Sequence, residues 1–272
     1  MEEIEKLKLK RVHLGGTGTM FLARGKERDY IYKPAESKFS KKPEPFRGIV
    51  QECAYEIQKI VDPDSAVVCK YINSGKISGS VQELIVVSND SKDYHDLQYG
   101  DRISELTSSE ISQFMREFVT DYLLCNFDSH GRNFITDRNG IIRGIDKEQS
   151  FRYMNEEEAL TPSIDFSPNT EIYGETEPIY NTIFRAYRDG KLDINFSDIE
   201  KCMDRVDRVP FSDYRQIFVP YCEACGEAFG EDPNKKLDNI CARRITMREN
   251  IKGFFQQLTE EREANLRSGK GK

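Results

Sequence analysis

The chain has 272 residues and a formal net charge of −7, from 40 Lys and Arg against 47 Asp and Glu. Its 16 Phe and 13 Tyr supply large apolar side chains, so the composition excludes disorder over most of the length. No apolar run approaches the roughly 20 residues of a membrane-spanning helix, and the acidic segment Met1 to Glu5 is unlike a secretory signal. Seven cysteines, an odd number, are typical of a reducing compartment. We therefore expect a cytoplasmic protein with no integral membrane segment, and the net acidity disfavours nucleic acid as a partner.

The first part of the chain predicts a small antiparallel sheet. Residues 7–14 alternate between apolar and polar side chains, and the short apolar runs 20–23 and 30–33 are typical of two further strands. A glycine turn at 15–19 joins the first two strands into a hairpin.

One helix and a second strand pair complete this part. Apolar residues at helical spacing predict a helix over 49–61, and residues 67–72 and 80–87 are typical of two strands around a turn. The stretch 88–101 is rich in Asp, Ser and Gly, so we place a lobe boundary there, with an N-terminal lobe of residues 1–95.

The remaining residues, 96–272, predict a mostly helical lobe. Capping residues Ser108 to Glu110 precede a helix whose apolar face runs from Ile111 to Leu123. Further helices are predicted near 179–188, 196–206, 213–229 and 237–258, and residues 262–272 are predicted to be a frayed tail. The fold class is therefore α+β, with a sheet lobe and a helical lobe.

The most informative segment combines an Asp, an Asn and a second Asp. Asn133 follows Asp128 by five residues, and Asp146 follows Asn133 by thirteen, after a strand-like run. Phosphotransferases use such spacing because a carboxylate orients the acceptor hydroxyl while a carboxylate and an amide oxygen hold Mg²⁺. The alternative is that these ordinary turn residues only organise a loop between a helix and a strand.

Residues earlier in the chain favour the catalytic interpretation by their order. The glycine turn can lay backbone N–H groups over phosphates, although such a turn alone is more often only a hairpin. Lys33 closes a strand where its ammonium can meet phosphates, and Glu52 on the next helix can pair with it. The turn residues expected at the nucleotide are Gly16, Thr17, Gly18 and Thr19.

Four segments carry a family resemblance, which covers about residues 12–151. Tyr32-Lys33-Pro34 and Gln51 to Ile57 resemble the nucleotide-binding lobe of the phosphatidylinositol 3-/4-kinase-like superfamily, in particular its type II 4-kinase branch. Asp128 to Phe134 is similar to the catalytic loop of that superfamily and equally to that of HipA-type protein kinases. Gly144 to Phe151 is similar to the lipid-kinase metal motif.

The resemblance implies a two-lobed protein-kinase-like fold that uses ATP and Mg²⁺. It implies that Asp128 is the catalytic base and that Asn133 and Asp146 are the magnesium ligands. The strand ending near Val87 would lead into an adenine hinge, where we expect Glu83 and Ile85 to contact the nucleotide. The chain departs from lipid kinases in having Ser129 after the catalytic Asp and Lys147-Glu148 after the metal Asp.

Several interpretations stay open at this point. We rank a protein Ser/Thr hydroxyl above a phosphoinositide as acceptor, and a small hydroxylated metabolite is a third class. A non-catalytic pseudokinase scaffold and transfer of AMP in place of the γ-phosphoryl group are alternatives on the same fold. The sequence names no activating partner and no oligomeric state.

Other chemical groups receive structural interpretations. We predict that His130 supports the loop instead of transferring a proton, and that Lys147 is a surface residue paired with Glu148. Cys222 and Cys225 lack the further ligands of a zinc site and are predicted to be buried helical cysteines. A basic loop is predicted to be solvated, with recruitment of anionic lipid or acidic peptide as the alternative; it comprises Lys38, Lys41, Lys42 and Arg47.

Overall fold

The computed structural model describes residues 9–12, 20–26, 28–35, 45–74, 77–168 and 177–269. The turn residues Gly16, Thr17, Gly18 and Thr19 and the basic residues Lys38, Lys41 and Lys42 lie outside these ranges.

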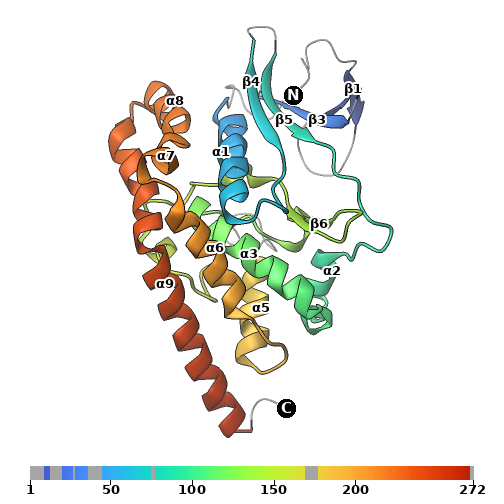
Figure 1. The fold of residues 1–272 in the computed structure, drawn as a ribbon, viewed down its shortest axis with the longest axis vertical. Coiled ribbons are helices and arrows are strands. Elements are labelled where there is room, and N and C mark those ends of the chain that lie inside the picture. The colour runs from blue at the N-terminus through green and yellow to red at the C-terminus, as the bar shows by residue number, and fades with distance from the viewer. Residues whose placement is uncertain are drawn as a thin grey trace.

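A five-stranded antiparallel sheet forms the N-terminal part, in the order β1-β2-β3-β5-β4 (Figure 1). Its register places Tyr32 opposite Val81 and Lys33 opposite Ser80. The helix α1 (Pro45–Val61) packs against β4 and β5. The strands are β1 (Leu9–Val12), β2 (Met20–Arg24), β3 (Asp29–Pro34), β4 (Cys69–Asn73) and β5 (Ser78–Glu83).

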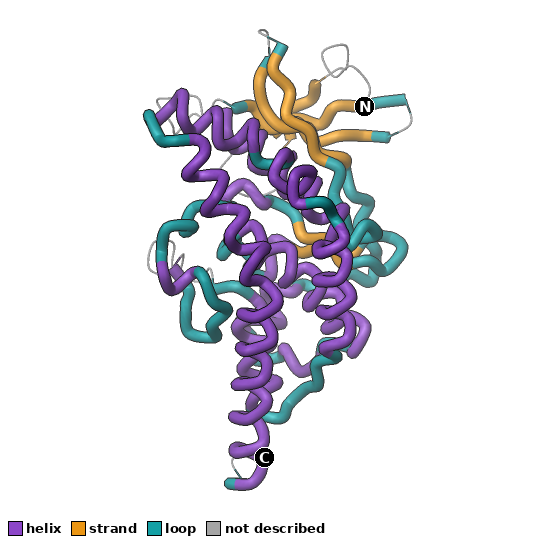
Figure 2. The backbone as a smooth tube through the Cα atoms, turned by 60° about the vertical axis from the view of Figure 1, so that its left-hand side comes forward, coloured by secondary structure: helices purple, strands orange, loops and turns teal. Residues whose placement is uncertain are grey.

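The C-terminal part is mostly helical, with one short hairpin near the sheet (Figure 2). Helix α3 (Ser108–Leu124) lies at its centre and begins with a capping box between Thr107 and Glu110. Glu110 was among the predicted capping residues, but the N-cap is Thr107 and not Ser108. The hairpin consists of β6 (Phe134–Thr136) and β7 (Ile142–Gly144). The other helices are α2 (Tyr94–Tyr99), α5 (Ile179–Arg188), α6 (Phe196–Arg208), α7 (Phe211–Gln216), α8 (Val219–Phe229) and α9 (Pro233–Arg267).

Some predicted elements were wrong in extent. The helix predicted over 213–229 is two helices, α7 and α8, because Pro220 lacks an N–H and starts a new helix. The predicted strand 80–87 ends at Glu83. Helix α2 lies within the segment 88–101, and the lobe boundary that we placed there stays a prediction.

The predicted frayed tail is also wrong, because α9 continues to Arg267. Arg262 holds this end of the helix by donating hydrogen bonds of 2.6 Å to the carbonyls of Tyr187 and Leu192 and of 2.7 Å to Asp193. No helix of the described ranges has the length and apolar character needed to cross a bilayer.

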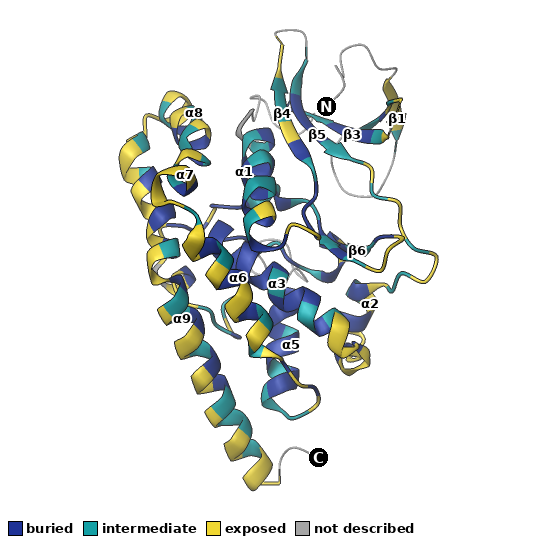
Figure 3. Ribbon diagram, viewed as in Figure 1, coloured by how far each residue is buried: buried dark blue, intermediate teal, exposed yellow. Residues whose placement is uncertain are grey.

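Buried residues occur along α1 and through the helical part (Figure 3). The described residues form two buried apolar clusters, and α1 belongs to the larger one. Val50, Ala54 and Ile57 of α1 pack with the core of the helical part, and the Cys53 thiol donates to the Ile217 carbonyl at 3.2 Å. A separate cluster lies on the opposite face of the sheet. Cys222 and Cys225 are buried on α8 with free thiols, as predicted. The helix beside the sheet is therefore fixed to the helical part.

Candidate active site

The loop between α3 and β6 carries Asp128 and Asn133. Helix α3 ends at Leu124, and the left-handed backbone of the capping residue Cys125 turns the chain into the loop. The Asn133 side-chain amide donates to the Asp128 carbonyl at 2.5 Å, so its Oδ1 stays available to a ligand. The Ile145 amide donates to the Asn133 carbonyl at 2.8 Å, which holds Asp146 next to the loop.

Lys33 and Asp146 meet although 113 residues separate them in sequence. The Lys33 Nζ donates to Asp146 Oδ1 at 2.7 Å. Burial opposes the charge on Lys33, but the carboxylates of Asp146 and Glu148 outweigh it and raise the pKa of the ammonium. The lysine of the sheet therefore stays protonated beside the loop of the helical part.

Glu52 forms no ion pair with Lys33, contrary to the prediction. Its Oε2 accepts a hydrogen bond of 3.1 Å from the backbone amide of Tyr71, which ties it to β4. The neighbouring residue of α1, Gln51, donates instead to Glu148 at 3.3 Å, and Arg47 pairs with Glu148 at 3.4 Å. The second carboxylate that interacts with Lys33 is thus Glu148, which the sequence analysis did not assign to the site, although its position two residues after Asp146 is a signal for it.

Glu83 and Ile85, the two residues predicted to contact the nucleotide after β5, lie in different surroundings. Glu83 turns its side chain to Arg28, with an ion pair of 2.7 Å, and its amide donates to the Val68 carbonyl. The chain then leaves the sheet, and the Ile85 N–H makes no hydrogen bond within the described ranges. The Ile85 N–H is therefore available to donate a hydrogen bond to a ligand, whereas the Glu83 side chain is paired with Arg28.

Three carboxylates crowd the centre of the site. Burial raises the pKa of Asp128 to about 6, and the charges of Asp146 and Glu148 add to this effect. Burial and the charge of Asp146 raise the pKa of Glu148 as well. A divalent cation would reduce the repulsion between the three carboxylates. Their combined negative charge is therefore compatible with a bound metal ion.

The donor set suits Mg²⁺ in particular. Asp146 offers a carboxylate and Asn133 an amide oxygen, both hard ligands. No group of three or more His, Cys, Asp and Glu side chains in the described parts of the chain could hold a metal by itself. An ion here would therefore combine two protein ligands with phosphate and water oxygens, as Mg²⁺ commonly does.

His130 lies beside Asp128 without a hydrogen bond to it. Its Nε2 is 3.7 Å from Asp128 Oδ1. Burial, His95 and Arg132 lower the pKa of His130, so the ring is neutral near pH 7. A neutral imidazole cannot stabilise the Asp128 carboxylate by charge, and the supporting role of His130 stays a prediction.

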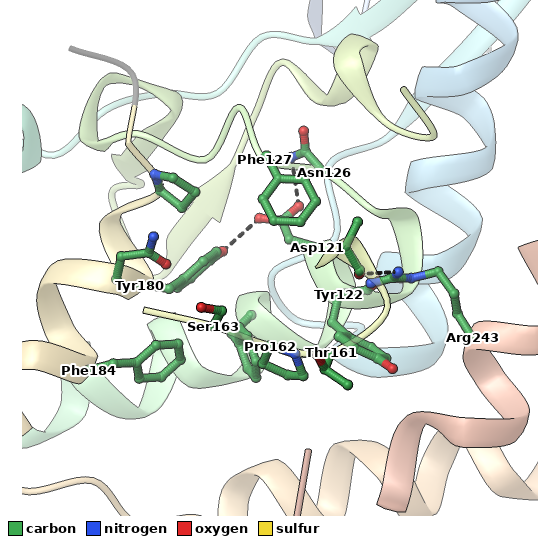
Figure 4. A pocket seen from close by; sticks show the side chains of 14 residues that line it. Asp121, Tyr122, Asn126, Phe127, Thr161, Pro162, Ser163, Tyr180, Phe184 and Arg243 are labelled. Atoms are coloured by element: carbon green, nitrogen blue, oxygen red, sulfur yellow. Dashed lines mark hydrogen bonds between the residues drawn. The ribbon is translucent and has the colours of Figure 1, made fainter. Parts of the chain in front are cut away.

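A buried carboxylate, Asp121 of α3, lies beneath the loop (Figure 4). It accepts hydrogen bonds from Ser129 at 2.7 Å, Asn126 at 2.8 Å and the Tyr180 hydroxyl at 2.7 Å. A cavity of about 50 Å³ adjoins this cluster, between the loop and α5. Sequence reasoning missed Asp121, because its partners come from the loop, from α5 and from the turn that carries Lys147.

The prediction for Lys147 was wrong. Its side chain is buried, not exposed, and its Nζ lies 2.7 Å from Asp121 and 3.3 Å from Glu117. Its neighbour Glu148 points instead to Arg47 and Gln51. Adjacent residues thus have opposite environments, because the short 3₁₀ turn 147–149 directs them to different sides.

Gly131 fixes the loop against α2. Its amide donates to the Gln98 side chain at 2.8 Å, and a Cβ added to it would lie 2.4 Å from backbone atoms of Tyr94 and His95. Because backbone atoms cannot yield, we expect Gly131→Ala to destabilise the protein by about 2 kcal/mol or more. Thermal unfolding measures this.

A matched control comes from Gly253 in the middle of α9, where an added Cβ meets nothing within 4 Å. Gly253→Ala should raise the melting temperature, with a gain of roughly 0.5–1 kcal/mol from helix propensity. Equal melting temperatures for Gly131→Ala and the unaltered protein would contradict the close packing of the loop on α2.

Comparison with known proteins adds a similarity of fold. The sequence matches no family profile and no curated protein. Among solved structures, a proinflammatory kinase of Helicobacter pylori, CtkA, superposes with a TM-score of 0.53, covering 94% of this chain and 97% of that one. The chain has a kinase-like fold. At 12% identity the similarity concerns architecture alone, and the resemblance to the phosphatidylinositol 3-/4-kinase branch and to HipA stays a prediction. In the kinase-like fold, the sheet with α1 and the loop 126–133 lie on the two sides of Lys33 and Asp146.

Proposed function

We propose that this protein is a kinase that transfers the γ-phosphoryl group of ATP to a hydroxyl group in the presence of Mg²⁺. The contact between Lys33 and Asp146, next to Asp128 and Asn133, carries the proposal. This site contains the ammonium of Lys33, two oxygen donors suited to a metal ion, and the Asp128 carboxylate, whose pKa is raised. These are the groups that phosphoryl transfer requires.

Each residue then has a separate role in the reaction. The Lys33 ammonium binds phosphate oxygens, and the Ile85 N–H is available to the adenine edge. Asp146 and Asn133 would hold Mg²⁺, which supplies positive charge to the phosphate oxygens. Asp128 orients the acceptor hydroxyl and takes its proton. Glu148 keeps a negative charge near Lys33 and so favours the protonated lysine.

For the acceptor we propose a protein Ser or Thr hydroxyl, ahead of a phosphoinositide. Ser129 supports this order, because the residue after Asp128 is fully buried and bonded to Asp121 and offers no cation to an inositol phosphate. The neighbour from H. pylori is described as a kinase without a stated acceptor. We place the activity in the cytoplasm, where seven unpaired cysteines would stay reduced.

The test uses ATP labelled in the γ or the α position, with Mg²⁺, a general protein acceptor and phosphoinositide vesicles. We expect γ-label, and no α-label, on protein, and no transfer when Mg²⁺ is chelated. Label on lipid would move the acceptor to the phosphoinositide class. Transfer of α-label would reveal an adenylyl transferase, and Mg²⁺-dependent ATP binding without any transfer would indicate a pseudokinase scaffold.

A further inference from the structure

We propose that Lys147 is a positioning residue, which sets the distance between Asp146 and Asp128 through a buried ion pair with Asp121. The inference rests on the proposed function, because it assigns Asp146 to the metal and Asp128 to the acceptor.

The first observation is the extent of the burial of Lys147. Only 4% of the residue is exposed, and its Nζ lies 2.7 Å and 2.8 Å from the two carboxylate oxygens of Asp121. A buried lysine is retained only where such partners compensate its charge. Glu117 Oε2 lies 3.3 Å from the same ammonium. Two buried carboxylates of α3 therefore hold the Lys147 side chain in place.

The second observation is that Asp121 binds both catalytic segments at once. One of its oxygens accepts from Ser129, the residue after Asp128, and both accept from Lys147, the residue after Asp146. A single carboxylate on the rigid helix α3 thus connects the two segments. A change in the Lys147 contact would shift Asp146 relative to Asp128.

The third observation is the backbone of Asp146. Its φ of 57° and ψ of 48° lie in the left-handed region, which residues with a side chain seldom adopt. Such a conformation persists only where neighbouring contacts hold it. The Lys147 anchor, immediately after Asp146, supplies this constraint.

The fourth observation is the space reserved for the lysine. A Cβ on Gly144 would lie 2.7 Å from Lys147 Nζ and 2.5 Å from Glu117 Oε2. The glycine before Ile145 and Asp146 thus lets the side chain pass beneath the strand end. The absence of a side chain at Gly144 leaves room for the ion pair between Lys147 and Asp121. This arrangement supports a fixed structural link between the two residues.

The experiment compares Lys147→Met, which keeps the length of the side chain and removes its charge, with the unaltered protein. Binding of a non-hydrolysable ATP analogue is measured by calorimetry over a range of Mg²⁺ concentrations. We expect Lys147→Met to need about 10 times more Mg²⁺ for half-maximal binding, as is typical when a partner of a metal ligand is lost. Analogue binding without Mg²⁺ should change less than about twofold, because Lys33 and the hinge are unaltered.

Two further variants separate positioning from stability. Lys147→Met combined with Glu117→Gln removes one buried acid along with the lysine, so it should fold better and show the same Mg²⁺ defect. Arg116 lies on α3, as Asp121 does, and Arg116→Met breaks a 2.6 Å ion pair with Asp62, outside the site. It should lower the melting temperature and leave the Mg²⁺ dependence unchanged.

The outcomes are distinct for the two proposals. A Mg²⁺ dependence of Lys147→Met or of the double variant equal to that of the unaltered protein would overturn the positioning role alone. The same Mg²⁺ defect in Arg116→Met would also overturn it, since any loss of stability would then suffice. Failure of the unaltered protein to bind the analogue would overturn the kinase proposal itself.

Discussion

Asp146→Asn should lower the rate of phosphoryl transfer by about 10³-fold or more, because the amide cannot supply the negative charge that holds a divalent cation. The substitution preserves the shape of the side chain, so the fold should remain. It removes the ionic partner of Lys33, at 2.7 Å, but leaves Glu148 to keep the lysine protonated. Transfer of γ-label to the acceptor measures the effect, together with Mg²⁺-dependent binding of ATP.

A suitable control is Asp189→Asn at the end of α5. Its carboxylate is 36% exposed against 38% for Asp146 and is likewise paired with a single cation, Arg188, but it lies away from the site. This control should keep full activity. Activity of Asp146→Asn above about one tenth of that of the unaltered protein would refute the assignment of Asp146 to the metal.

Asp128→Asn should lower kcat by about 10²–10⁴-fold and leave the affinity for ATP within about a factor of two. The reason is that Asp128 acts on the acceptor hydroxyl and not on the nucleotide. Its loss should therefore not reproduce the Mg²⁺-binding defect of Asp146→Asn. Nucleotide affinity reduced as strongly as kcat would place Asp128 in the nucleotide site instead.

The same residue predicts how the rate of the unaltered protein depends on pH. Its pKa is raised to about 6, first by burial and then by Asp146 and Glu148. A base must be ionised, so kcat/KM should be constant above this pKa and fall tenfold for each pH unit below it. In Asp128→Asn the residual rate should lose this acidic limb. A limb that persists in the variant would assign the titration to another group.

Local patterns in the sequence predicted the elements better than the contacts between them. The capping box of α3 and the apolar periodicity of α5 and α6 are properties of short segments, so sequence was sufficient to place them. The same reasoning gave the candidates Lys33 and Asp146, which the structure brings into contact, while their catalytic roles remain predictions.

The errors concern residues whose environment depends on packing. Glu52 and Gln51 are neighbours on α1. Only the rotation of the helix against β4 decides which of them faces Glu148 and the site. Lys147 beside Glu148 has the sequence pattern of an exposed ion pair. No local signal in the sequence indicates that Lys147 is buried against Asp121. A buried polar cluster that combines residues from distant segments produces no periodic pattern in the sequence, so its members cannot be predicted from periodicity.

Helix α1 joins the sheet to the helical part. Gln51 and Arg47 contact Glu148 of the helical part, while the same helix packs against β4 and β5. The 2.7 Å contact between Lys33 and Asp146 is a second and direct link between the two parts. A shift of the sheet relative to the helical part would therefore act on both links, so the position of Lys33 and the position of α1 are coupled.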